Sequence, residues 1–323
     1  MMRIDLKFIA IVFFLFSMLC QTILSQTVDS TDYKDIEENR TLGGHFFTPH
    51  NLMKSPYIIT YLRTSLGLGQ IRSINTPFFA IGENQYKYSQ GEVLAAILSL
   101  EYQHSVKEWL AVSIQFNLSG RLGSKLNTLL AYGINYATSF NIGWKIKAVQ
   151  TKRFYLSPIF ELNNGNYSVI NIRQLVEDIT NEIQGASLFS SNNVLNGTAG
   201  LSAAYGFTHF IGLEGQANIG YGETIQKSLD NTWFYNLGLN VDMNFTKIFK
   251  VPMSISVGYM HSSYPKGEND ILYENNVGVA QISYIGRSDI VLSLDFLSSR
   301  EIYTTDGSTI WLNSLTFTMR YLF

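Results

Sequence analysis

The chain has 323 residues, of which 46% are apolar, 14% are aromatic and only 15% are charged, with a net charge of −2. Soluble domains usually carry about 25% charged residues. The apolar content excludes intrinsic disorder, and the slight negative charge disfavours a nucleic-acid partner, which calls for a basic surplus. A bundle of membrane helices is also disfavoured, because it would need several stretches of about 20 apolar residues.

The first residues have the pattern of a secretory signal peptide. Two basic residues, Arg3 and Lys7, flank the start of an apolar run over 8–20, and a short polar stretch follows. We place the cleavage after Ser25. An alternative is a lipoprotein cysteine at Cys20, although Leu19 stands where that motif has a small residue. Cleavage at Ser25 removes the single cysteine, so the exported chain would have no disulfide and no thiolate metal site.

The predicted mature chain begins with a polar N-terminal segment. Residues 26–56 are acidic up to about Arg40 and precede the first strand-like pattern. We expect this segment to lie in the periplasm, either as a flexible tail or as a partial plug of the domain that follows. The predicted organisation is therefore a signal peptide over 1–25, this segment over 26–56, and one large domain over 57–323.

Most of residues 57–323 alternate between apolar and polar residues with a period of two. In the last segment one face is almost wholly apolar, and the other is mostly polar. The apolar face carries Trp311, Leu315, Phe317, Met319, Tyr321 and Phe323. Such alternation predicts β-strands that separate two environments. Because it persists for about 10–13 residues, against about 5–6 in soluble strands, it favours strands that cross a bilayer.

Twelve such segments can be counted, and the connections between them alternate between short and long. Ten or fourteen strands are alternatives, because 69–88 and 124–134 each contain enough apolar residues for a short strand. An even number of strands with alternating connections is typical of an outer-membrane barrel, which has short periplasmic turns and long outside loops. We therefore predict an all-β, antiparallel up-and-down transmembrane barrel with both termini in the periplasm. The predicted strands are 57–68, 92–105, 108–119, 135–149, 153–162, 196–206, 208–220, 231–245, 250–263, 275–285, 288–298 and 310–323.

The four tryptophans fit this arrangement. Trp109 and Trp144 would lie near the periplasmic rim, whereas Trp233 and Trp311 would lie near the outer rim. Aromatic girdles at both interfaces are characteristic of membrane barrels.

The C-terminal residues 315–323 resemble those of bacterial outer-membrane β-barrel proteins of the porin and channel kind. The terminal Phe323, with Tyr321 and further apolar residues at alternate positions before it, is similar to the signal that the barrel-assembly machinery reads. The resemblance implies insertion into a Gram-negative outer membrane, with outer-membrane lipid and lipopolysaccharide as partners. The junction Leu24-Ser25-Gln26 and the many asparagines also resemble proteins of the Bacteroidota.

A channel or porin-like transporter for small solutes is the first functional hypothesis. Alternation directs charged residues of both signs into the lumen, without the single-sign ring that would indicate ion selectivity. These charges could line an open pore or could pair and fill the interior. The predicted lumen residues are Arg63, Glu101, Lys145, Lys147, Glu161, Glu214, Asp242, Asp295 and Arg320.

The longest predicted outside loop, 163–195, contains apolar residues at helical spacing. The spacing predicts an amphipathic helix of about four turns, with an apolar side formed by Ile172, Leu175, Val176, Ile179 and Ile183. This helix could fold over the barrel mouth as a constriction, or pack against neighbouring loops.

Two further functions remain open. His261 and Ser263, with Glu274 on the next strand, weakly resemble the His-x-Ser motif of outer-membrane lipid A deacylases, which implies an outer-leaflet lipid hydrolase. Alternatively, the barrel could be a structural or adhesive protein that presents its loops. The sequence indicates no cofactor and no metal-ligand spacing.

Overall fold

The computed structural model describes residues 40–79, 86–122, 133–170, 189–223, 231–264, 273–287, 289–303 and 309–323. The predicted signal peptide, the first part of the N-terminal segment and the predicted helix around Ile172–Ile183 lie outside the described residues.

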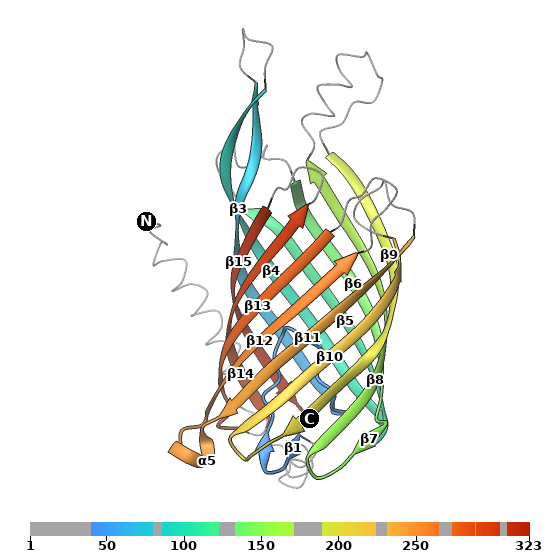
Figure 1. Ribbon diagram of the computed structural model, residues 1–323, viewed down its shortest axis with the longest axis vertical. Coiled ribbons are helices and arrows are strands. Elements are labelled where there is room, and N and C mark those ends of the chain that lie inside the picture. Colours follow the sequence, from blue (N-terminus) through green and yellow to red (C-terminus); the bar gives the residue numbers. More distant parts are fainter. Residues whose placement is uncertain are drawn as a thin grey trace.

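Twelve long strands form a closed antiparallel barrel, so the predicted fold class is confirmed (Figure 1). Each strand pairs with the next along the chain, and the last strand pairs with the first. The strand β7 (Val149–Gln150) is a short extra pairing, and β6 pairs directly with β8. The barrel strands are β3 (Tyr61–Phe79), β4 (Tyr86–Lys107), β5 (Leu110–Leu122), β6 (Gly133–Ile146), β8 (Phe154–Ile170), β9 (Phe189–Gly206), β10 (Ile211–Gly222), β11 (Thr232–Asn244), β12 (Met253–Tyr264), β13 (Tyr273–Tyr284), β14 (Ile290–Tyr303) and β15 (Thr309–Leu322).

Short connections gather at one end of the barrel. Figure 1 shows β7, the C-terminus and the short helix α5 (Thr246–Phe249) at this end. At the opposite end β3 and β4 continue as a paired hairpin beyond the neighbouring strands. The sequence pattern ended the first strand at residue 68 and left a short strand within 69–88 as an alternative. In the structure, backbone pairing continues from Ile74 to Phe79 after an irregularity in register. The strands β8 and β9 also extend further than the sequence predicted. Because β8 runs to Ile170 and β9 starts at Phe189, the predicted loop 163–195 is shorter in the structure.

The outward faces of the strands are apolar and exposed. Leu98 and Leu100 on β4, Phe116 on β5 and Leu237 on β11 are each between 41% and 50% exposed. So large a continuous apolar surface has no place in water, where exposed apolar patches are costly. It suits a barrel that is surrounded by lipid. Among the described residues, no helix is both long and apolar enough to cross a membrane.

The described part of the N-terminal segment, from residue 40 onward, lies inside the barrel. Its strands β1 (Thr41–Leu42) and β2 (His45–Phe46) form a tight hairpin, and both turn glycines, Gly43 and Gly44, have positive φ. Figure 1 shows the chain rising from this hairpin into the lower half of the barrel. The structure therefore places the described part of this segment as a plug, which was one of the two arrangements expected for it.

The first barrel strand begins at Tyr61, four residues later than the apolar pattern predicted. Tyr57, Ile58 and Ile59 are buried, as part of the segment rather than of the wall. The amide of Gln103 on β4 donates hydrogen bonds to the carbonyl oxygens of Tyr57 (3.1 Å) and Ile59 (2.7 Å). Because this stretch is covered on both sides, it is apolar throughout and resembles a strand in sequence. We call residues 40–60 the inner segment.

Candidate functional site in the barrel lumen

Two buried histidines attach the inner segment to the barrel wall. The Nε2 atom of His45 lies 3.0 Å from Oδ2 of Asp242 on β11, and neither side chain is exposed. The Nε2 atom of His50 lies 2.7 Å from Oε2 of Glu214 on β10, again at almost no exposure. A buried carboxylate is costly unless it is paired or hydrogen-bonded. His45 supplies a hydrogen bond to Asp242, whereas His50 and Glu214 are close enough to pair but do not form a hydrogen bond in this structure.

The backbone between these histidines is also held by the wall. The N–H of Thr48 donates to Oδ2 of Asp242 at 3.0 Å, and its hydroxyl donates to Oγ of Ser254 on β12 at 2.7 Å. The carbonyl oxygen of Pro49 accepts a long bond, 3.4 Å, from the amide of Gln281 on β13. The segment therefore contacts three successive strands at this level.

Asn51 links the segment to the seam between the last and first strands. Its Nδ2 donates to Oδ2 of Asp295 on β14 and to Oγ1 of Thr318 on β15, both at 2.6 Å. Its Oδ1 accepts a hydrogen bond of 2.9 Å from Arg63 on β3. One carboxamide thus joins three neighbouring strands, using both its donor and its acceptor.

Lys54 is the most connected residue of the inner segment. Its ammonium donates to Glu101 on β4 at 2.7 Å and to Gln115 on β5 at 2.6 Å, and lies 3.5 Å from Glu161 on β8. Arg63 binds the other oxygen of Glu101 at 2.8 Å. Burial alone would lower the pKa of Lys54, but the carboxylates of Glu101 and Glu161 outweigh it and hold the pKa above its ordinary value.

The remaining predicted lumen residues have different surroundings. Lys145 is buried on β6, and its ammonium donates to Oε1 of Gln103 at 2.9 Å. The guanidinium of Arg320 is buried and lies 4.6 Å from the centre of the Tyr61 ring. Lys147 follows the last residue of β6, within a short connection, and its side chain is half-buried. The structure therefore gathers Arg63, Glu101, Glu161, Glu214, Asp242 and Asp295 around the inner segment, whereas Lys147 lies at the barrel end.

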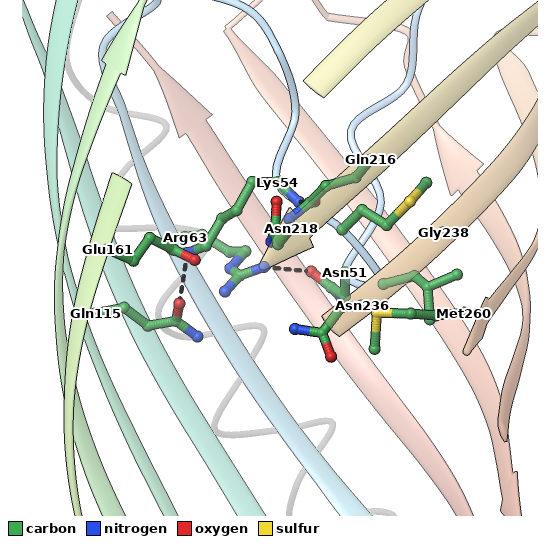
Figure 2. Close-up of a pocket in the computed structure, with 12 residues that line it drawn as sticks. Asn51, Lys54, Arg63, Gln115, Glu161, Gln216, Asn218, Asn236, Gly238 and Met260 are labelled. Atoms are coloured by element: carbon green, nitrogen blue, oxygen red, sulfur yellow. Dashed lines mark hydrogen bonds and ion pairs between the residues drawn. The ribbon is translucent and has the colours of Figure 1, made fainter. Parts of the chain in front are cut away.

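A cavity of about 210 Å³ lies above the inner segment, on its side away from the short connections. Figure 2 shows carboxamide side chains gathered around it, together with Lys54 and Arg63. Its floor is part of the inner segment, and its walls come from β3, β5, β8, β10, β11 and β12. The lining residues are Asn51, Leu52, Met53, Lys54, Arg63, Gln115, Glu161, Gln216, Asn218, Asn236, Gly238 and Met260.

The predicted hydrolytic residues are not connected as a catalytic pair requires. Nδ1 of His261 lies 2.9 Å from Oδ1 of Asn276, its direct partner in the β12–β13 register. Within the described part of the chain, no hydrogen bond joins His261 to Ser263 or to Glu274. Ser263 is 6% exposed and lies opposite Glu274 in the register. An amide, rather than the expected carboxylate, therefore contacts the imidazole. No group of three His, Cys, Asp or Glu side chains able to hold a metal ion occurs among the described residues.

The C-terminal residues lie at the closing seam. The rings of Tyr321 and Phe323 have centres 5.2 Å apart, and the N–H of Phe323 donates to the carbonyl oxygen of Thr60 at 3.2 Å. Both termini of the barrel domain therefore meet at the end that carries the short connections.

Sequence reasoning did not identify the partners that the inner segment supplies, above all His45, His50, Asn51 and Lys54. These residues precede the first strand and share no period with it. One signal was available: several acids were directed into the lumen, and buried carboxylates need partners. The polar residues of the N-terminal segment, which directly precedes the barrel, could have been proposed as these partners.

Comparison with known proteins adds evidence on the fold. No protein-family model and no curated protein matches the chain. An outer-membrane channel from Pseudomonas putida F1 is 10% identical, with 86% of this chain and 100% of that chain covered at a TM-score of 0.50. The translocator domain of the autotransporter NalP from Neisseria meningitidis is 8% identical, with 83% and 90% covered at 0.49. The NanC porin is 10% identical, with 80% and 98% covered at 0.47. At such identities the likeness concerns the fold alone, which is that of the outer-membrane β-barrels.

Proposed function

We propose that this protein is a bacterial outer-membrane barrel that passes small solutes, with the inner segment as its gate. The segment closes the lower half of the lumen, and the cavity above it receives solute from the outer side. The partners of the barrel are outer-membrane lipid and lipopolysaccharide around its apolar belt. Tyr321 and Phe323 are the residues that the barrel-assembly machinery reads, and residues 1–25 are the signal peptide that is removed on export.

One observation carries the proposal: the floor of the lumen cavity is a separate piece of chain rather than the barrel wall. Four consecutive residues of the inner segment, 51–54, line the cavity. A barrel whose only role was to present loops would need no separate segment as the floor of a polar cavity.

The contacts around residues 45–54 suit a gate that opens reversibly. They combine hydrogen bonds and ion pairs with the buried apolar side chains of Phe47, Leu52 and Met53, and water can replace the polar contacts when the segment moves. A typical hydrogen bond contributes only about 0.5–1.5 kcal/mol net, because water competes for both partners. The segment is therefore held firmly as a whole, while its polar contacts can be exchanged for contacts with water.

A cysteine pair can test this role, because cleavage of the leader leaves the mature chain without any other cysteine. The hydroxyl oxygens of Thr48 and Ser254 are 2.7 Å apart, so the variant T48C/S254C can form a disulfide between segment and wall. The pair is placed in a background with a loosened segment, His45→Ala/His50→Ala. The measurement is single-channel conductance in planar bilayers, before and after reduction.

We expect the loosened background to conduct, the oxidised pair to stop the current, and a reductant to restore it. The variant with Thr48→Cys alone is the matched control and should conduct under both conditions. A loosened barrel that is folded but passes neither current nor solute would overturn the channel. Current that continues through the oxidised pair would overturn the gate.

A further inference from the structure

We infer that the lumen cavity binds an uncharged, polyhydroxylated solute of about one sugar ring, through Gln216, Asn218 and Asn236. The inference rests on the proposed function, because it names the class of solute that this cavity would admit. It goes beyond that function in assigning a binding site to three carboxamides on β10 and β11.

The charged residues around the cavity are already paired with one another, and Nε of Arg63 is the one buried nitrogen of Lys54 and Arg63 without a hydrogen-bond partner among the described residues. The Lys54 ammonium has Glu101, Gln115 and Glu161 as partners, and Arg63 binds both Glu101 and Asn51. Two bases therefore face two acids, and the local charge balances. An ionic solute would have to break these pairs, which favours a neutral solute instead.

The carboxamides, in contrast, have unused hydrogen-bonding groups. Asn218 is 8% exposed, and its Oδ1 has no hydrogen-bond partner in the described part of the chain. Its side chain lies over Gly200 on β9, where a Cβ would collide with that oxygen. Glycine at this position makes room for the amide, and a buried polar group without a partner is costly unless a ligand or water supplies one.

Two further amides extend the same polar wall. Asn236 lies directly opposite Asn218 in the β10–β11 register, and Figure 2 shows both side chains at the cavity. Gln216 accepts the N–H of Lys54 with its Oε1 at 2.7 Å, which leaves its Nε2 for a ligand. A carboxamide offers donors and an acceptor side by side. Neighbouring hydroxyl groups of a sugar ring need that same combination.

The other side of the cavity is apolar. Leu52 and Met53 pack with Met260 and with the buried Val277 and Val279. Unbranched Met side chains adapt to irregular shapes, so this wall can cover the C–H face of a ring. The cavity is smaller than the roughly 300–1,000 Å³ of pockets for drug-sized ligands, which fits a single ring.

The test is calorimetric titration of the folded full-length protein with three probes: glucose, galactose and N-acetylglucosamine. Glycine and acetate serve as zwitterionic and anionic comparisons. The variants are Asn218→Ala and Asn236→Ala, with Asn141→Ala on β6 as a control that does not line the cavity. Circular dichroism checks that each variant keeps its strands.

We expect at least one sugar to bind saturably, and each cavity variant to weaken it by about 3- to 10-fold, as loss of one hydrogen bond predicts. The control should bind like the wild type. The inference would be overturned if no sugar bound saturably at concentrations up to about 50 mM, which covers weak affinities. Stronger binding of glycine or acetate, or cavity variants that bind unchanged, would also overturn it.

Binding and passage are measured separately, so the two proposals can fail separately. If the barrel binds sugar but passes no solute, the proposed binding site is supported and the proposed channel function is overturned. If the barrel conducts but binds none of the sugars, the channel function is supported and the proposed binding site is overturned.

Discussion

His45 and Asp242 form a fully buried contact between the inner segment and the barrel wall, with Nε2 and Oδ2 3.0 Å apart. The two residues are 197 positions apart in the chain. Removing one partner of such a pair leaves a buried group without compensation, which typically costs several kcal/mol. Loss of either partner is therefore costly while the segment stays in place, whereas outward movement of the segment would expose both groups to water together.

Asp242→Ala should loosen the inner segment, because Thr48 and His45 then lose the same acceptor. We expect a cysteine at position 48 to react with a water-soluble maleimide at least about 10-fold faster in this variant, which corresponds to about 1.4 kcal/mol. Asp289→Ala is the matched control, since its carboxylate binds Arg287 in a short connection. Equal rates in the two variants would contradict the role of Asp242.

Gly212→Ala should disturb the same level of the segment from the wall side. A Cβ at Gly212 on β10 would collide with the rings of His45 and Phe47. Overpacking of this kind costs about 1–3 kcal/mol, so we expect a lower thermal midpoint and greater maleimide access. A Cβ at Gly120 on β5 would have no atom within 4 Å, so Gly120→Ala should leave the thermal midpoint and the maleimide access unchanged. A Gly212→Ala variant as stable as the Gly120→Ala variant would argue against close contact.

The ion pairs of Lys54 with Glu101 and Glu161 should keep the inner segment in place up to high pH. The pKa of Lys54 lies above its ordinary value of 10.5, so its contribution is complete below that pH and is lost as the pH rises through the raised value. We expect conductance to increase only under such alkaline conditions. Lys54→Arg should move the increase to still higher pH, because arginine keeps its charge. The account would be contradicted if the conductance of the wild type increased near neutral pH and if Lys54→Arg abolished that increase.

His261→Ala should have no effect on envelope lipids. The imidazole contacts the amide of Asn276, which cannot stabilise an imidazolium as a carboxylate does. Mass spectra of lipid A and phospholipids from cells with wild type, His261→Ala or an empty vector should therefore agree. A lipid product that is present with wild type and absent with His261→Ala would restore the hydrolase hypothesis.

The barrel could be predicted from sequence because a membrane strand records both environments in alternate residues. Twelve segments were found for this reason, and the short connections between them followed. The extension of β3 to Phe79 was left only as an alternative within 69–88, because the sequence there does not alternate between apolar and polar residues. Tyr57 to Ile59 was assigned to a strand because an apolar run does not reveal whether it is covered by lipid or by the barrel itself.

The candidate site was only half predictable. Alternation placed Glu101, Asp242 and Asp295 toward the lumen, since a strand's period fixes which face a residue occupies. Their partners could not be found in this way. Contacts such as that between Asn51 and Asp295 depend on the path of an irregular segment through the finished barrel.

The hydrogen bond between Phe323 and Thr60 has a mechanical consequence. Thr60 is the last residue of the inner segment, and it directly precedes β3, which closes the barrel by pairing with β15. A force that draws the segment out of the lumen is therefore transmitted to the strand pair that holds the cylinder shut. The proposed gate and the closure of the wall share this one contact, so opening by removal of the segment would put force on the pairing between β15 and β3.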